Sequence, residues 1–364
     1  MSDNFDIAIV GAGIAGASLA AELGTHARVV LLEAEDRPGY HSTGRSAAFW
    51  AESYGGPMVQ PLTSASGPWL AERGFLSDRG ALTLARARDE EKVDEFVDQF
   101  SQAGVRIERW DRLAVERSLP GLREDWQFGV WEPDCKDIDV GGLHGWYLAE
   151  ARRSGVELRC RAALEQAEYA SGWKLSTSDG KRISCETLVN AAGAWADPVA
   201  ELAGIKPLGI TPMRRTIAQL RVSPEPLPAL PLVLDVSGGF YFKPEAGRIW
   251  LSPHDETPCP PCDAAPEELD IATAIDRLES VVDWKIERVE HKWAGLRSFA
   301  PDRFPVYGPD PMNPAFFWFA GQGGYGIQTA PAAARLAAQL LLGLSTDGLT
   351  AAIDRDCYLA GRFG

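Results

Sequence analysis

Short apolar runs followed by glycine-rich turns mark both ends of the chain. Near the N-terminus, the largely β-branched run Ile7–Val10 leads directly into the glycine-rich residues 11–16, and residues 17–23 then have helical spacing. A second apolar run, Val29–Leu32, follows. This order predicts a β-α-β unit, which requires a parallel sheet covered by helices.

The same order returns near the C-terminus. The apolar run Phe316–Ala320 precedes a glycine-rich turn at 321–326 and a helical pattern from about residue 328 to 342. Between the two ends, helical spacing covers residues 89–103, 142–153 and 269–282, and strand patterns cover 156–160, 173–177, 188–190, 216–222, 240–243 and 248–251. Strand-rich and mixed segments therefore lie between two ends that resemble each other.

The first glycine-rich turn has the spacing of a dinucleotide-binding motif. Gly11, Gly13 and Gly16 form G-x-G-x-x-G, in which the glycines permit a sharp bend, close approach of a pyrophosphate and close packing of helix and strand. The helix N-terminus offers free N–H groups to the anion. Glu33 ends the second strand, where an acid accepts hydrogen bonds from a ribose and disfavours a 2′-phosphate. The motif alone leaves FAD and NAD open.

A large cofactor that touches both glycine-rich turns explains why these turns stand at opposite ends of the chain. We therefore expect an α/β or α+β fold with two domains. A Rossmann-like nucleotide-binding domain would be assembled from residues 1–50, 142–210 and 300–364, and a substrate-binding domain with a mixed sheet would comprise residues 51–141 and 211–299. The length of 364 residues agrees, because single cores stop growing at roughly 250–300 residues.

Composition and charge narrow the choice of partners. Hydrophobic residues make up 45% and charged residues 24% of the chain, as in ordinary globular proteins. The formal net charge of −15 repels nucleic-acid phosphates and anionic membranes, so neither is expected as a main partner. No apolar stretch reaches the roughly 18 residues of a transmembrane helix. Asp3 and Asp6 stand where a targeting leader would be basic, so we expect a cytoplasmic protein.

Six cysteines are too few for a disulfide framework in a chain of this length. Cys259 and Cys262 have the C-x-x-C spacing of a redox pair or of half a zinc site, but no second C-x-x-C completes four ligands, and no metal site is expected. Both lie in a proline-rich stretch, residues 253–266, that is typical of a surface loop. A structural role without chemistry is the simpler interpretation.

Five segments resemble the glycine/D-amino-acid oxidase (DAO) family of FAD-dependent oxidoreductases, and within it the bacterial FAD-dependent D-arginine dehydrogenases. These segments are residues 11–16, 38–48, 190–195, 291–299 and 321–328. The resemblance covers essentially the whole chain and implies a DAO-type two-domain fold with a Rossmann-like FAD-binding domain. Family members with covalent flavin use a cysteine soon after the segment that holds Arg297. Residues 298–308 contain no cysteine, so noncovalent FAD is expected.

By resemblance, the residues expected to bind FAD come from both ends and the middle of the chain. They are Gly11, Gly13, Ile14, Ala15, Gly16, Glu33, Ala34, Ser42, Thr43, Arg45, Ser46, Ala47, Ala192, Gly193, Trp195, Arg297, Gly323, Gly324, Tyr325, Gly326, Ile327 and Gln328. The Gly323–Gly324 turn would direct the positive end of the C-terminal helix at the flavin pyrimidine, stabilising negative charge by roughly 0.3–2 kcal/mol. The alternative is a helix that only covers the sheet.

An amino-acid substrate brings a carboxylate, which arginine binds through two charge-assisted hydrogen bonds. The resemblance puts Arg215 and Arg297 at this carboxylate. Arg214 and Arg215 would point to opposite faces of a strand, so that one faces the pocket and the other is solvated; an ordinary surface role for Arg215 is the alternative. Arg297 lies in an apolar strand, where an unpaired charge is unfavourable, so we expect an anionic partner, either the substrate or an internal acid.

Four further positions complete the expected catalytic set. Tyr54 and Tyr241 match family positions where a phenol binds the substrate carboxylate or closes the pocket, although a core aromatic is the alternative for Tyr241. Gln328 and the backbone carbonyl of Gly324 match positions near the substrate amine. The protein would supply orientation and a dry pocket for the reaction.

The resemblance implies oxidative deamination of a D-amino acid, with hydride transfer from Cα to flavin N5, release of a 2-oxo acid and ammonia, and reoxidation by oxygen, a quinone or another acceptor. The arginine-specific pattern of the D-arginine dehydrogenases has a histidine, a threonine and an acid at positions where this chain has Phe49, Ala51 and Ala81. A buried guanidinium without its carboxylate is unfavourable, so we expect neutral or hydrophobic D-amino acids to be preferred. An oxidase of glycine, sarcosine or another secondary amino acid is the nearest alternative. A flavoprotein without turnover and an NAD-linked dehydrogenase are more distant ones.

Overall fold

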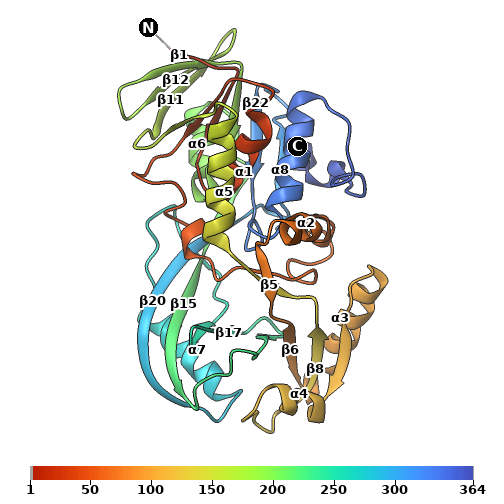
Figure 1. Ribbon diagram of the computed structural model, residues 1–364. Coiled ribbons are helices and arrows are strands. Elements are labelled where there is room, and N and C mark those ends of the chain that lie inside the picture. Colours follow the sequence, from red (N-terminus) through yellow and green to blue (C-terminus); the bar gives the residue numbers. More distant parts are fainter. Residues whose placement is uncertain (1–2, 364) are drawn as a thin grey trace.

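A computed structural model describes residues 3–363 and places both ends of the chain in the half that contains a parallel sheet (Figure 1). Six strands form this sheet, and all neighbours are parallel except the last pair at the edge. In spatial order the strands are β10 (Glu157–Arg159), β3 (Val29–Leu32), β2 (Ile7–Val10), β14 (Thr187–Asn190), β22 (Phe316–Ala320) and β21 (Val306–Pro309).

The parallel sheet is covered on both faces because its strands are apolar on both faces. Ile7 and Ile9 of β2 enter one core, whereas Ala8 and Val10 enter the other. Helices cover the first core, namely α1 (Ile14–Leu23), α2 (Gln60–Glu72), α5 (Val140–Arg153) and α8 (Ala330–Leu342). The second core is covered by α6 (Ala196–Leu202) and a four-stranded sheet of β1 (Asp3–Asn4), β13 (Arg182–Cys185), β12 (Trp173–Thr177) and β11 (Leu164–Tyr169).

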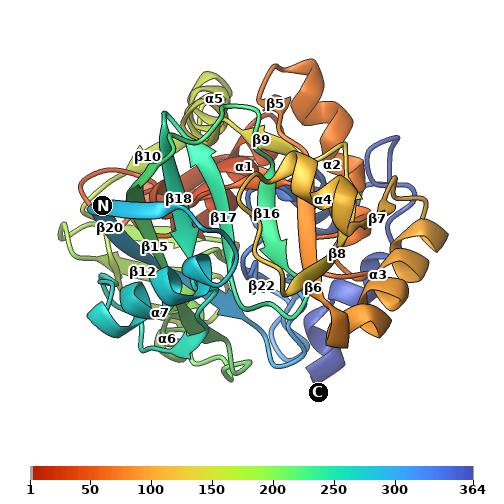
Figure 2. The same ribbon diagram turned by 90° about the horizontal axis from the view of Figure 1, so that it is seen from below.

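A nine-stranded mixed sheet forms the other half of the molecule. Figure 2 shows its central strands side by side, with α7 toward one side and α3 and α4 toward the other. Its strands are β19 (Thr257–Pro258), β15 (Thr211–Ser223), β18 (Arg248–Ser252), β17 (Tyr241–Glu245), β16 (Leu232–Asp235), β6 (Ala81–Arg86), β8 (Trp126–Glu132) and β7 (Glu108–Asp111), with β20 (Lys285–Phe299) paired to β15. The helices are α3 (Glu90–Gln102), α4 (Arg112–Ser118) and α7 (Glu268–Glu279).

The remaining elements are a small sheet and several short helices. A three-stranded sheet consists of β4 (Phe49–Trp50), β9 (Lys136–Ile138) and β5 (Leu76–Asp78). Short 3-10 helices are η1 (Thr43–Arg45), η2 (Ala87–Asp89), η3 (Gly193–Trp195), η4 (Arg355–Tyr358) and η5 (Ala360–Phe363).

No helix within residues 3–363 combines the length and the apolar content needed to cross a membrane.

The structure confirms the predicted fold class and corrects several boundaries. Helix α1 begins at Ile14 rather than at residue 17, and α8 begins at Ala330 rather than near residue 328. Strand β15 is longer than the predicted 216–222. The division into domains stays a proposal, and α2, which lies in the proposed substrate-binding segment, packs against α8 and the core of the parallel sheet.

The close approach of α1 to β2 predicts opposite effects for two glycine-to-alanine substitutions. A Cβ at Gly16 would lie 1.8 Å from the Gly11 carbonyl oxygen, whereas a Cβ at Gly145 in α5 would meet no atom within 4 Å. We expect Gly16→Ala to lower the free energy of unfolding by about 1–3 kcal/mol through overpacking. Gly145→Ala should raise it by about 0.5–1 kcal/mol. Urea unfolding of both variants checks this, and equal stabilities would contradict it.

Candidate active site

A cavity of about 380 Å³, the nucleotide cavity, lies where β2, β3 and β14 end. Gly11 has a φ of +98°, and a Cβ there would lie 2.6 Å from the carbonyl oxygen of Ala191, so only glycine fits. Gly13 stands at the N-cap of α1 and has no side chain with which to cap the helix. The amide of Ile14 donates to Thr43 Oγ1 at 2.9 Å, which joins the glycine turn to the segment that follows β3.

Glu33 lies in the wall of the nucleotide cavity and is only 8% exposed. Its two carboxylate oxygens accept hydrogen bonds from the amides of Ala12 and Glu35, each at 3.0 Å, and each oxygen keeps a second lone pair. A narrow glycine turn at a helix N-terminus suits a pyrophosphate, and a buried acid suits ribose hydroxyls. The residues present therefore fit FAD.

The predicted FAD-binding residues divide into three groups in the structure. The nucleotide cavity is lined by Gly11, Gly13, Ile14, Ala15, Glu33, Ala34, Ser42, Thr43, Ala192, Gly193, Trp195 and Gly323. A small inner pocket of about 20 Å³ is lined by Ser46, Ala47, Arg297, Gly324, Ile327 and Gln328. Gly16, Arg45, Tyr325 and Gly326 line neither space.

Each residue of the third group has another position. Gly16 packs against the turn at Gly11, and Gly326 packs against Gln322. Tyr325 faces a third space, the substrate cavity described below. The guanidinium of Arg45 donates to the carbonyl of Ala264 at 2.9 Å and forms an ion pair with Asp263, so it points away from the nucleotide cavity. Contact of these four residues with FAD therefore stays a prediction.

The substrate cavity has a volume of about 490 Å³ and adjoins the inner pocket. Phe49, Tyr54 and Gly324 line both spaces. Arg215 lines the substrate cavity, and Tyr241, Arg297 and Gln328 line the inner pocket. The structure thus gathers all six residues of the predicted catalytic set around two adjoining spaces.

Strand pairing explains why the two arginines face the same way. Arg297 of β20 lies opposite Met213 of β15, which stands two residues before Arg215. Opposed residues and residues two apart share a face, so both arginines project from one face of the sheet. On β20, Leu296 and Ser298 line the nucleotide cavity while Arg297 lines the inner pocket. This one strand therefore contributes to both spaces.

Arg297 is a buried cation without an anionic partner among the described residues. It is 6% exposed, and its Nη1 has no hydrogen-bond partner within residues 3–363. Burial lowers the pKa of Arg297, and the nearby positive charge of Arg215 lowers it further. The internal salt bridge that the sequence left open is therefore wrong for this part of the chain. The guanidinium is available to a bound anion.

Arg215 is 2% exposed, so the alternative of a surface arginine is wrong. Its Nε donates to the carbonyl of Asp255 at 2.8 Å, and its Nη2 lies 3.0 Å from Glu256 Oε1. Burial alone would lower the pKa of Arg215, but Tyr54, Tyr241 and Glu256 raise it overall. The guanidinium is thus fixed as a charged group in the cavity wall.

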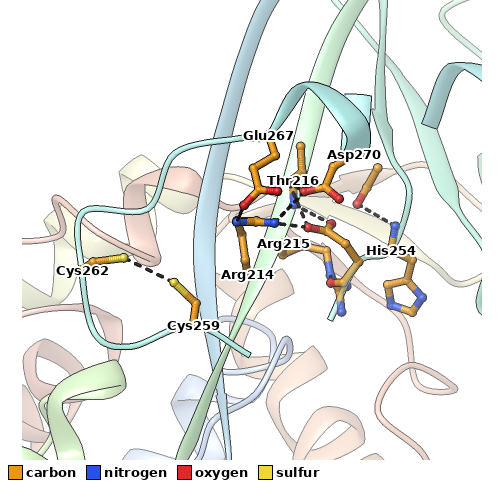
Figure 3. A network of polar contacts seen from close by, with 10 residues as sticks. Arg214, Arg215, Thr216, His254, Cys259, Cys262, Glu267 and Asp270 are labelled. Carbon is orange, nitrogen blue, oxygen red and sulfur yellow. Dashed lines mark hydrogen bonds and ion pairs between the residues drawn. The ribbon is translucent and has the colours of Figure 1, made fainter. Parts of the chain in front are cut away.

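The prediction that Arg214 is solvated is wrong. Arg214 is 8% exposed and forms ion pairs with Glu267 and with Asp270, the latter at 3.0 Å (Figure 3). The sequence missed this because α7 crosses the outer face of β15 and brings Asp270, in its first turn, over the strand. The two neighbouring arginines therefore have different roles, since one is locked in an internal network and the other faces the cavity.

Aromatic side chains surround the arginines. The ring of Phe49 lies 4.8 Å from that of Tyr54 and 6.2 Å from that of Tyr241, measured between centroids. Burial raises the pKa of Tyr241, so its phenol stays protonated and acts as a hydrogen-bond donor. Tyr241 therefore packs as a core aromatic and also faces the inner pocket.

The Gln328 side chain holds neighbouring segments together. Its Nε2 donates to the carbonyl of Tyr54 at 3.0 Å and to Thr63 Oγ1 at 2.9 Å, and its Oε1 accepts from the amide of Ala51 at 3.3 Å. Only one acceptor lone pair remains for a ligand. Its main observed contacts position Tyr54, and a role near the substrate amine stays a prediction.

Two cavity residues were not found from the sequence. Glu132 accepts hydrogen bonds from the amide of Glu52 at 2.7 Å and from Ser53 Oγ at 2.5 Å, and burial raises its pKa. A lone acid at the end of an otherwise apolar strand was the available signal. His254 donates from Nδ1 to the carbonyl of Gly238 at 2.9 Å. Burial lowers the pKa of His254 to about 3, and Arg215 contributes to this effect.

A glycine-rich turn at a helix N-terminus, with a buried acid at the end of the next strand, is the arrangement expected of a dinucleotide-dependent enzyme. The family model described as FAD dependent oxidoreductase (DAO) matches residues 6–340. The chain therefore belongs to this family, and it binds FAD.

Known proteins resemble the chain over nearly its full length. Glycine oxidase from Pseudomonas aeruginosa is 26% identical, covering 93% of this chain and 94% of that protein. The structure of glycine oxidase from Geobacillus kaustophilus superimposes with a TM-score of 0.85 at 22% identity, covering 99% of both chains. That of L-proline dehydrogenase from P. horikoshii gives 0.86 at 21%, covering 100% of this chain and 98% of that one. The predicted family is confirmed, but these relatives do not support the narrower resemblance to D-arginine dehydrogenases.

Removal of the unpaired charge predicts a contrast between two arginine variants. Without substrate, Arg297→Met should leave the free energy of unfolding unchanged or raise it by about 1–3 kcal/mol, because an uncompensated buried charge is lost. Arg214→Met should lower it by about 1–3 kcal/mol, because Glu267 and Asp270 lose their cation. Urea unfolding of the FAD-bound proteins measures both. Equal destabilisation of the two variants would contradict the assignment.

The low pKa of His254 predicts that the folded protein loses stability as the pH falls. The unfolded chain takes up this proton as the pH falls below about 6.5, whereas the folded protein does so only near 3, so stability is lost as the pH falls through this window. His254→Asn keeps a donor and tolerates the φ of +54° at this position. Between pH 7.5 and 5, the wild type should lose about 2 kcal/mol more than the variant. Parallel pH dependences in chemical unfolding would refute this.

Proposed function

We propose that the protein oxidises the Cα–N bond of glycine or of an N-substituted amino acid such as sarcosine or proline. The observation that carries the proposal is the unpaired guanidinium of Arg297, which lines a small pocket and belongs to a strand that also lines the nucleotide cavity. An amino-acid carboxylate supplies the missing anion. When bound, FAD supplies the hydride acceptor. The names of the glycine oxidase and L-proline dehydrogenase relatives support this substrate class.

The residues of the chain would bind and orient the substrate. Arg297 and Arg215 hold the carboxylate, and the protonated phenol of Tyr241 donates a further hydrogen bond. Phe49 and Tyr54 line both spaces and exclude water from them. Productive orientation then depends on the fixed position of the carboxylate rather than on covalent chemistry by a side chain.

The amine must be neutral before its Cα hydrogen leaves, and the cavity histidine is a poor proton acceptor for it. The pKa of His254 is lowered to about 3 by burial, so at neutral pH the imidazole is uncharged and does not accept a second proton. The substrate therefore delivers its ammonium proton to solvent on entry. A rise of kcat/KM with pH toward the substrate's own ammonium pKa is the corresponding kinetic pattern.

A neutral or hydrophobic D-amino acid is the second candidate. The substrate cavity of about 490 Å³ exceeds the space that glycine needs, and Phe49, Ala51 and Ala81 make part of its wall apolar. This wall would accept an aliphatic side chain through hydrophobic contact.

A substrate panel distinguishes the two candidates. Glycine, sarcosine, L-proline, D-alanine, D-methionine and D-arginine are each added anaerobically to the FAD-bound protein, and bleaching of the visible flavin absorbance is followed. We expect glycine, sarcosine or proline to give a kcat/KM at least tenfold above the D-amino acids, which corresponds to roughly 1.4 kcal/mol.

The other outcomes are equally informative. The highest value for D-methionine would replace the first candidate with the second, and the highest value for D-arginine would contradict both. Absence of bleaching with every compound would refute amino-acid oxidation. Repeating the active reactions with oxygen and with a quinone identifies the electron acceptor.

A further inference from the structure

Cys259 and Cys262 lie in the loop between β19 and α7, with their Sγ atoms 3.5 Å apart (Figure 3). Both thiols are free and half-buried, and Pro260 and Asp263 beside them are exposed. A disulfide requires a separation of about 2.05 Å. Closing the remaining distance requires movement of the two side chains or of the loop. The two thiols therefore lie near the separation of a disulfide, with two residues between them in the sequence.

The segment around the pair contacts both candidate binding elements. Directly before β19, the Asp255 carbonyl and the Glu256 carboxylate hold the guanidinium of Arg215 at 2.8 and 3.0 Å. The amide of Cys259 donates to the carbonyl of Pro212 at 3.0 Å, which fixes the loop to the start of β15.

On the C-terminal side of the pair, the loop contacts Arg45 at the end of η1, directly after residues that line the nucleotide cavity. Asp263 forms an ion pair with Arg45, and the carbonyl of Ala264 accepts from its Nη1 at 2.9 Å. Asp263 also accepts a hydrogen bond from the Tyr40 hydroxyl at 3.1 Å, and Tyr40 lines the nucleotide cavity. A movement of Cys262 is transmitted to its neighbour Asp263 and from there to these contacts.

We propose that Cys259 and Cys262 are a reversible dithiol–disulfide site, oxidised by small-molecule disulfides, whose oxidised form weakens FAD binding through Asp263 and Arg45. One thiolate attacks the small disulfide and releases the first small thiol. The second cysteine then attacks the mixed disulfide and releases the other small thiol, forming the protein S–S bond. Two protein thiols and one small disulfide thus give one protein disulfide and two small thiols.

The pKa of the Cys262 thiol determines how the rate of thiol–disulfide exchange depends on pH. Burial raises the pKa of the Cys262 thiol, and the hydrogen bond with Cys259 raises it further. Because the thiolate is the reacting species, exchange is slow at neutral pH and faster in alkaline buffer. The reaction does not involve the amino-acid substrate, so its success or failure is independent of the proposed function.

The test begins with the FAD-bound, full-length protein in mixtures of reduced and oxidised glutathione, followed by alkylation and peptide mass spectrometry. The wild type should form a linkage between Cys259 and Cys262, and Cys262→Ser should instead carry glutathione on Cys259. Cys357→Ser is the matched control, because Cys357 is also half-buried but contacts Asp354 rather than a thiol, and it should retain the linkage. Failure to form the linkage in the most oxidising mixture overturns the site.

A second measurement tests the coupling to FAD. The dissociation constant for FAD is determined by fluorescence for reduced and oxidised apoprotein reconstituted with the cofactor. Oxidation should weaken FAD binding at least threefold in the wild type and in Cys357→Ser, and should not change it in a Cys259→Ser, Cys262→Ser double variant. An unchanged dissociation constant in a protein that carries the linkage overturns the coupling.

Discussion

The site depends on one uncompensated charge. Arg297 places a guanidinium in the buried C-terminal part of β20, and no acid within residues 3–363 forms an ion pair with it. A buried charge without a partner is unfavourable, and the carboxylate that we propose as its ligand would complete the interaction. The neighbouring Arg215 differs, since Glu256 and the Asp255 carbonyl already hold it. The pair therefore combines one fixed cation with one that requires a ligand.

The pairing of β15 with β20 gives this charge its position. Alternation along β20 sends Leu296 and Ser298 into the nucleotide cavity and Arg297 into the inner pocket, so this one strand contributes to both spaces. The same alternation on β15 sends Arg214 away to the acids of α7. Loop residues then close the site, with Tyr54 held by Gln328 and Arg215 held by Glu256, directly before β19.

Much of the fold followed from local sequence patterns, because strand–glycine–helix order and hydrophobic periodicity act over short distances. The parallel strands at Ile7–Val10 and Phe316–Ala320 and the glycine turn at residues 11–16 are of this kind. The partners of individual side chains were not predictable, because they come from distant segments. Asp270 reaches Arg214 only after α7 folds across β15, and His254 enters the cavity from a stretch that has the composition of a surface loop.

Binding of a carboxylate that carries no amine tests the role of Arg297 most directly. Acetate, with acetamide as the neutral control, is titrated into the FAD-bound protein, and the dissociation constant is measured by calorimetry or by perturbation of the flavin spectrum. The account predicts that Arg297→Met weakens acetate binding at least tenfold, as expected for a lost charge-assisted hydrogen bond, and leaves acetamide unaffected. Equal binding of acetate by the wild type and the variant would contradict it.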